Sequence, residues 1–158
     1  MRVAAVYSID DERSVALVRI LVAEDFVSFR RFICSTLEKS PEFQVVGEVS
    51  DGLEAVQKAE ELKPDLILLD IGMPKMNGIE AARQIRQLSP DSKIIFVSQE
   101  SSREIVEEAL SLGAQGYVVK AMAAHELMAA VEAVIAGKQF VSKSLQISFR
   151  SERPGDIE

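Results

Sequence analysis

A chain of 158 residues, of which 47% are hydrophobic, is long enough for one domain with a single buried core. Its formal charge of −7 and its lack of tryptophan argue against a surface that attracts nucleic acid or stacks on bases. The single cysteine, Cys34, excludes an internal disulfide, and its apolar surroundings favour a buried side chain over a nucleophile. No stretch approaches the ~20 apolar residues of a membrane span, so we expect a soluble, cytoplasmic protein that does not contact membranes.

From Val18 onward, short runs rich in β-branched residues alternate with stretches of helical periodicity. Several of the short runs are almost wholly apolar, which is typical of strands covered on both faces in a parallel sheet. The predicted strands are Val18–Ala23, Gln44–Val49, Leu66–Leu69, Ile94–Val97 and Tyr117–Val119.

An amphipathic helix is predicted after each strand. In the first helix, the apolar residues Phe29, Phe32, Ile33 and Leu37 share one face. The fourth opens with a capping box, Ser101-x-x-Glu104, and ends near Gly113, while the others span Leu53–Leu62, Ile79–Leu88 and His125–Ala136. Five strand–helix units predict a doubly wound α/β fold, with a five-stranded parallel sheet of flavodoxin-like order 2-1-3-4-5 and helices on both faces.

Two segments lie outside these units. Residues 1–17 precede the first predicted strand, and we expect them to be a disordered extension or an added leader. Residues 138–158 form a linker-like tail, and we expect mobility in residues 141–158, which end in the polar, proline- and glycine-containing stretch Ser151–Asp156. The predicted domain therefore spans residues 18–137.

Polar side chains follow the predicted strands at the points where the strands end. Glu24 and Asp25 follow the first, Asp70 the third, Ser98 the fourth and Lys120 the fifth. Ligands of open α/β sheets bind at the carboxyl ends of the strands, where these side chains converge. Three carboxylates placed together repel each other unless a cation lies among them, and Mg²⁺ prefers such oxygen ligands.

This arrangement suits phosphoryl transfer to an aspartate. Asp25 and Asp70 are the expected direct ligands of Mg²⁺, and Glu24 acts directly or through water. An Asp70 oxygen can then attack an incoming phosphoryl group, while Lys120 supplies a second positive charge. Ser98 can hydrogen-bond the phosphoryl oxygens after transfer. The acidic pair is also suited to capping the first helix, and a lone aspartate after a strand is often only a loop residue.

Four stretches of the sequence resemble the receiver domain of two-component response regulators. They are VRILVAED (Val18–Asp25), DLILLDIGMPKMNG (Asp65–Gly78), IIFVS (Ile94–Ser98) and GAQGYVVK (Gly113–Lys120). The resemblance extends over residues 18–137, with the acidic pair, the acceptor aspartate, the hydroxyl and the lysine in the order and spacing of the family. Asp70 followed by Met73-Pro74 and Gly78 is the most specific single motif.

The resemblance implies that Asp70 is the phosphoacceptor and that Lys120 is the lysine of the family's site. It implies that Mg²⁺ is bound by Glu24, Asp25 and Asp70 together with the backbone carbonyl of Gly72. Family members receive the phosphoryl group from a histidine kinase or from a small donor such as acetyl phosphate. They act as switches and catalyse only their own phosphorylation and dephosphorylation.

The resemblance also identifies Ser98 as the switch hydroxyl and Tyr117 as the aromatic residue that rotates on activation. The alternative interpretation is that Tyr117 is only an aromatic residue at the edge of the sheet, with no role in switching. In the family, phosphorylation changes the surface formed by the fourth helix, fifth strand and fifth helix. We therefore expect partner binding or homodimer formation through that surface on activation.

The segment Gly137–Leu145 (GKQFVSKSL) resembles the linker of the NarL-like subclass, in which a LuxR-type helix-turn-helix follows the receiver. Ala121, where many receivers have proline, agrees with that subclass. No output domain follows in this sequence. The chain is read either as a single-domain regulator or as a receiver separated from a DNA-binding parent, and we expect no direct nucleic-acid binding by this chain.

Three other classes of protein remain as alternatives. A phosphatase of the haloacid-dehalogenase type also uses an aspartyl nucleophile, Mg²⁺ and a lysine, but it needs a second acid at the position of Gly72. A flavodoxin-like cofactor binder needs a glycine-rich phosphate loop after the first strand, and the sequence has none. A scaffold without phosphorylation is disfavoured because every group that phosphorylation requires is present.

Overall fold

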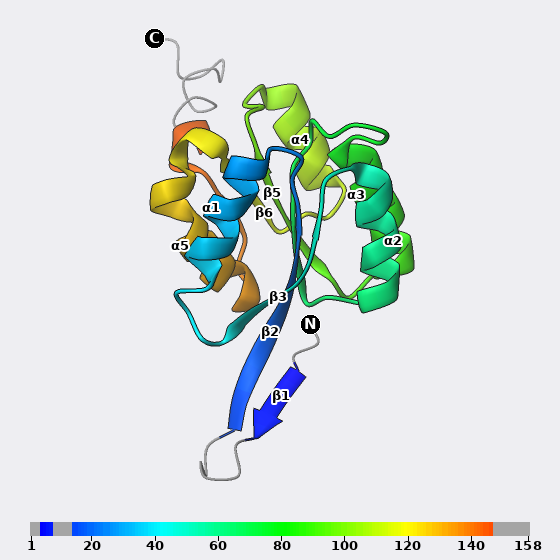
Figure 1. Cartoon of the computed structure of the whole chain (residues 1–158). Helices are drawn as coiled ribbons and strands as arrows, with labels where there is room; N and C mark the ends of the chain where they lie inside the picture. The colour runs from blue at the N-terminus through cyan, green and yellow to red at the C-terminus, as the bar shows by residue number, and fades with distance from the viewer. Residues whose placement is uncertain (1–3, 8–13, 147–158) are drawn as a thin grey trace.

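The computed structural model describes residues 4–7 and 14–146, and a sheet flanked by helices forms its centre (Figure 1). Six parallel strands lie in the order β3-β2-β4-β5-β6-β7. Their bounds are β2 (Ser14–Ala23), β3 (Phe43–Val49), β4 (Leu66–Leu69), β5 (Lys93–Ser98), β6 (Gly116–Val119) and β7 (Phe140–Val141). β2 to β6 match the five predicted strands in the predicted order, which confirms the doubly wound α/β fold.

Helices cover both faces of the sheet. α1 and α5 pack on one face, and α2, α3 and α4 pack on the other (Figure 1). The helices are α1 (Val27–Leu37), α2 (Gly52–Leu62), α3 (Gly78–Leu88), α4 (Arg103–Ser111) and α5 (Ala123–Ile135), and the short 3₁₀ turn η1 (Lys120–Met122) joins β6 to α5. All five predicted helices are present. In the part of the chain that the structure describes, no helix is both long and apolar enough to cross a membrane.

The central strand β4 contains apolar residues alone because both of its faces are covered. Successive side chains of a strand point to opposite faces of the sheet. Leu66 and Leu68 therefore pack with α1 and α5, whereas Ile67 and Leu69 pack against α2, α3 and α4. All four side chains are buried, so the first polar residue of this segment, Asp70, comes where the strand leaves the core.

The start of α4 differs from the prediction. The helix is capped by Ser102, whose hydroxyl accepts a hydrogen bond from the N–H of Ile105 at 3.4 Å. The predicted capping box at Ser101 and Glu104 is therefore wrong by one residue. Two adjacent serines offer equivalent capping oxygens, and the backbone of Ser102 has the extended conformation that an N-cap requires.

The N-terminal segment differs from the expected disordered extension. Ala4–Tyr7 form β1, which pairs antiparallel with Ser14–Leu17 at the start of β2. β2 therefore begins four positions before the predicted Val18, because its first residues continue the strand as one arm of a hairpin. The remaining residues of the predicted extension, 1–3 and 8–13, lie outside the described residues.

The first part of the predicted linker-like tail is folded. Phe140 and Val141 form β7 beside β6, and residues 143–146 form a helical turn. Leu145 in that turn is only 2% exposed and packs in the core on the side of α2, α3 and α4. The first part of this segment therefore belongs to the folded domain, while residues 147–158 lie outside the described part.

A first prediction concerns Asp51, the N-cap of α2. Its carboxylate accepts a hydrogen bond from the N–H of Glu54 at 2.8 Å and lies 3.4 Å from the Lys75 ammonium. These contacts hold the pKa of Asp51 below its usual value, and the backbone hydrogen bond from Glu54 is the largest cause. We expect Asp51→Ala to lower the free energy of unfolding by about 1 kcal/mol near neutral pH, the usual contribution of an N-cap.

The pH dependence follows from the sign of this shift. Because folding lowers the pKa of Asp51, its stabilisation is complete above the unfolded-state pKa of about 3.9 and is lost as the pH falls through the folded-state value. Urea unfolding should therefore show the difference between wild type and Asp51→Ala narrowing in acid. Asp51→Asn keeps a capping oxygen and is the matched control. Equal instability of the two variants near neutral pH would contradict the capping role.

Candidate functional site

The five predicted site side chains from the strand ends meet at one edge of the sheet. β2 is followed by Glu24 and Asp25, β4 by Asp70, and β6 by Lys120, while Ser98 ends β5. Oxygen atoms of the three carboxylates all lie within 4.8 Å of one another. The structure therefore brings together the acidic pair and the aspartate that the sequence separates by 45 residues.

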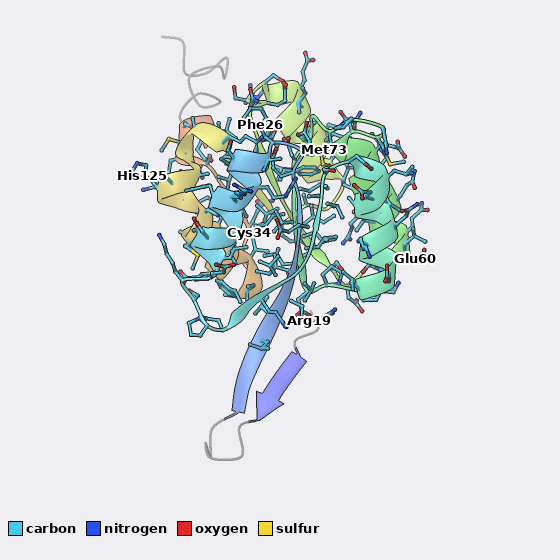
Figure 2. The ribbon with its side chains drawn as sticks, in the orientation of Figure 1. Arg19, Phe26, Cys34, Glu60, Met73 and His125 are labelled. Carbon is cyan, nitrogen blue, oxygen red and sulfur yellow. The ribbon has the colours of Figure 1, made fainter. Side chains whose placement is uncertain are left out.

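A cavity of about 180 Å³ opens at this edge. Figure 2 shows Phe26 and Met73 at the same end of the sheet as this cavity and Arg19 at the opposite end. The cavity is lined by Asp25, Phe26, Asp70, Gly72, Ser98, Gln99, Glu100 and Lys120. An open cavity bordered by carboxylates, a hydroxyl and an ammonium group can accept a small anionic ligand if a cation offsets the acidic charge.

The ammonium group of Lys120 joins two of the carboxylates. Its Nζ lies 2.8 Å from Oε1 of Glu24 and 3.3 Å from Oδ2 of Asp70. It also lies 4.8 Å from the ring centroid of Phe29, within the range of a cation–π contact. Burial alone would lower the pKa of Lys120, but the hydrogen bond to Glu24 and the charges of both carboxylates raise it. Lys120 is therefore a fixed positive charge in this site.

Glu24 is the most buried acid of the site, at 1% exposure. Burial raises the pKa of its carboxyl group, and the hydrogen bond from Lys120 opposes that effect. Its Oε2 accepts a hydrogen bond from the N–H of Phe26 at 2.9 Å, and the Arg30 side chain donates to its backbone carbonyl at 2.7 Å. Asp25, in contrast, is exposed and borders the cavity.

Asp70 is held by its own backbone and by the turn that follows it. Its N–H donates to the carbonyl of Ala23 at 3.0 Å, and its Oδ1 accepts from the N–H of Ile71 at 2.8 Å. The N–H of Gly78 donates to the carbonyl of Ile71 at 2.7 Å, which brings the start of α3 against Asp70. Asp70 is only 6% exposed. Its Oδ1 is held by the N–H of Ile71, and its Oδ2 faces the ammonium group of Lys120.

Two glycines near Asp70 have opposite surroundings. A Cβ atom at Gly78 would lie 2.0 Å from the carbonyl oxygen of Asp70, which no side chain can accommodate without a backbone shift. A Cβ atom at Gly72 would have no neighbour within 4 Å. Gly78 therefore permits the close approach of α3 to Asp70, whereas Gly72 leaves open space beside the cavity.

The two predicted switch residues are linked through Glu100. The hydroxyl of Ser98 accepts a hydrogen bond from the N–H of Glu100 at 3.1 Å. The hydroxyl of Tyr117 donates to the carbonyl of the same residue at 2.7 Å. Tyr117 is fully buried against Phe96, with ring centroids 6.1 Å apart, and burial raises the pKa of its phenol to about 12. The interpretation of Tyr117 as an edge aromatic is therefore wrong for this conformation.

The sequence analysis did not identify every residue of the site. Phe26 and Gln99, to which the sequence assigned no role, line the cavity. Their positions directly after the acidic pair and after Ser98 were the available signal. His125 lies exposed on α5, as expected for a solvated helix residue, and Figure 2 shows it on the outer side of that helix.

Comparison with known proteins identifies the family. The response regulator receiver domain family matches residues 20–132, and the chain therefore belongs to that family. This membership implies signalling through phosphorylation. No other class considered from the sequence is needed to account for the fold or for the residues at the sheet edge.

Individual relatives agree with this assignment. The transcriptional regulatory protein DegU of Brevibacillus brevis is 39% identical over 124 residues, which cover 78% of this chain and 52% of DegU. The nitrate/nitrite response regulator protein NarL of Escherichia coli (strain K12) is 37% identical over 126 residues, covering 80% of this chain and 58% of NarL. The chain thus spans little more than half the length of these two relatives.

A solved structure shows the same fold. The two-component response regulator of the LuxR family from Aurantimonas sp. SI85-9A1 superposes with a TM-score of 0.82 at 31% identity. The match covers 87% of this chain and 98% of that structure. It supports the resemblance to NarL-like receivers that the sequence indicates.

The two glycines beside Asp70 provide a second prediction. We expect Gly78→Ala to lower the free energy of unfolding by about 1–3 kcal/mol, the usual cost of overpacking, although alanine favours a helix. Gly72→Ala, where the new methyl group meets no neighbour, should leave stability unchanged. Urea unfolding of both variants checks the contrast, and an equally stable Gly78→Ala protein would show that α3 does not need this close approach.

Proposed function

We propose that the chain is a phosphorylation-controlled signalling switch in which Asp70 accepts a phosphoryl group from a histidine kinase or a small phosphodonor. The contact of the Lys120 ammonium with both Glu24 and Asp70, beside an open cavity, is the observation that carries the proposal. It supports a site in which positive charge is fixed next to the nucleophile before the donor arrives.

The donor atoms at the sheet edge fit a hard divalent cation such as Mg²⁺. Three carboxylates within 4.8 Å carry more negative charge than one lysine offsets. We propose that Asp25, Asp70 and the carbonyl of Gly72 bind the ion. Glu24 already contacts Lys120 and the N–H of Phe26, so it would act through water. When bound, Mg²⁺ neutralises charge on the phosphoryl oxygens during transfer.

In the proposed reaction, an Asp70 carboxylate oxygen attacks the phosphorus atom of the donor. A new O–P bond forms as the bond from phosphorus to the donor breaks, and the donor leaves with the electron pair. The leaving group is the imidazole of a kinase histidine, or acetate when acetyl phosphate is the donor. Lys120 is aligned to stabilise the negative charge on the transferred group, because its ammonium already lies 3.3 Å from Asp70.

The proposed output of this reaction passes through Ser98. The O–H of Ser98 would donate to a phosphoryl oxygen, and a movement of Ser98 toward that oxygen would pull on the N–H of Glu100, which donates to the Ser98 hydroxyl here. Because Tyr117 donates to the carbonyl of Glu100, a shift of the loop after β5 changes the position of the phenol. This would alter the surface formed by α4, β6 and α5, and we propose that this surface binds a partner or a second copy of the chain.

Phosphorylation by a small donor is the direct test and the third prediction. Incubation with acetyl phosphate and Mg²⁺ should add one phosphoryl group, measured by intact-protein mass spectrometry. Asp70→Asn removes the nucleophile but keeps its size, and chelation of the metal removes the counter-charge, so neither sample should be labelled. Sedimentation before and after labelling would then measure dimer formation.

An unlabelled wild-type protein would be examined further with beryllofluoride, a mimic of the phosphoryl group. A complex formed with Mg²⁺ would assign the failure to the donor or to rapid hydrolysis. Absence of both label and complex would contradict the proposed function and leave a scaffold without phosphorylation as the explanation. Labelling of Asp70→Asn would place the acceptor elsewhere.

The fourth prediction separates the roles of Lys120 and the carboxylates. We expect Lys120→Ala to slow labelling by roughly 100-fold, a typical loss when one fixed charge-stabilising donor is removed. Binding of Mg²⁺, measured by calorimetry, should persist because the carboxylates remain. Asp25→Asn should instead weaken Mg²⁺ binding and labelling together. Labelling of Lys120→Ala at the wild-type rate would contradict the proposed role of Lys120 in stabilising the transferred group.

A further inference from the structure

A buried acid outside the phosphorylation site connects α5 to the C-terminal segment. Glu126, in the first turn of α5, is 7% exposed. Its Oε1 accepts a hydrogen bond from the hydroxyl of Ser142 at 2.5 Å, and its Oε2 accepts from the N–H of Lys143 at 3.2 Å. A buried carboxylate requires such donors, so these contacts fix where the segment after β7 lies.

Ser142 in turn binds the end of β6. Its N–H donates to the carbonyl of Tyr117 at 2.9 Å, and its hydroxyl accepts a hydrogen bond from the N–H of Val119 at 2.9 Å. The β6–β7 pairing ends at Tyr117 and Val141, so the backbone of β7 supplies no partner for the N–H of Val119. The side chain of Ser142, which is fully buried, takes the place of that missing strand residue.

This hydrogen bond lies directly before the lysine of the site. Val119 is the last residue of β6, and Lys120 is the first residue of η1. The direction in which the chain leaves the sheet at Val119 therefore determines where the Lys120 side chain begins. Leu145, buried in the same core cluster as Tyr117, anchors the segment on the other side of Ser142.

We infer that Ser142 and Glu126 are positioning residues for Lys120. Glu126 orients the hydroxyl of Ser142, which holds the N–H of Val119 and thereby fixes the backbone from which Lys120 reaches Glu24 and Asp70. This inference rests on the proposed function, in which Lys120 stabilises the transferred group. It makes the first part of the segment after α5 a part of the phosphorylation site, although none of its described residues, up to 146, lines the cavity.

The fifth prediction concerns Ser142→Ala, which leaves the N–H of Val119 without its partner. We expect labelling by acetyl phosphate to slow roughly tenfold, as for other residues that orient a directly acting group. Mg²⁺ affinity should stay at the wild-type value, because the carboxylates follow β2 and β4 and do not depend on Ser142. A purely structural role would lower stability without separating the labelling rate from metal binding.

Ser92→Ala is the matched control. Ser92 is also a buried serine, 1% exposed, whose hydroxyl donates to the carbonyl of Pro64 at 2.5 Å, but it lies just before β5 at the opposite edge of the sheet. We expect this variant to be labelled at the wild-type rate under conditions in which urea unfolding shows both variants folded. If Ser142→Ala does not fold, Ser142→Cys keeps a similar volume with a weak acceptor and replaces it.

Three results would overturn the inference. They are labelling of the folded Ser142 variant at the wild-type rate, a parallel loss of Mg²⁺ affinity, and an equal slowing in Ser92→Ala. Each of these leaves the proposed function intact as long as the wild-type protein is labelled on Asp70. If the wild-type protein neither accepts a phosphoryl group nor binds beryllofluoride, the proposed function fails and the inference fails with it.

Discussion

The ion pairs of Lys120 with Glu24 and Asp70 are the interactions on which the site depends. Both acids are almost fully buried, and two buried carboxylates near each other are costly unless a positive charge lies between them. Their ammonium partner directly follows β6, while the acids follow β2 and β4. The site is therefore assembled only when the sheet is complete from β2 to β6.

Much of this arrangement could be predicted from the sequence. The wholly apolar β4 and the apolar run Ile94–Val97 of β5 identify a parallel sheet covered on both faces, and such a sheet brings its carboxyl strand ends to one edge. The positions of Glu24, Asp25, Asp70 and Lys120 follow from this rule, because each comes directly after a strand. The end of a buried strand coincides with the end of an apolar run, and such runs are evident in the sequence.

Contacts that depend on the exact position of a side chain could not be predicted. The choice between Ser101 and Ser102 as the cap of α4 is decided by the backbone conformation of one residue. The burial of Tyr117 and its bond to the carbonyl of Glu100 depend on packing between β5, β6 and the following loop. β7 was missed because two residues give no periodicity, and its pairing partner lies more than 20 positions away in the sequence.

The placement of β7 gives a physical reason why residues 140–146 fold with the domain. Without it, β6 would be an edge strand with unpaired backbone groups. The N–H groups of Phe140 and Ser142 instead donate to the carbonyls of Gln115 and Tyr117, and the hydroxyl of Ser142 accepts from Val119. β6 is thereby paired with β7 at Gly116 and Tyr117, and the side chain of Ser142 supplies the partner at Val119, directly before Lys120. A lysine that must hold two buried acids at one geometry needs a backbone that does not fray, and β7 together with the side chain of Ser142 supports that backbone.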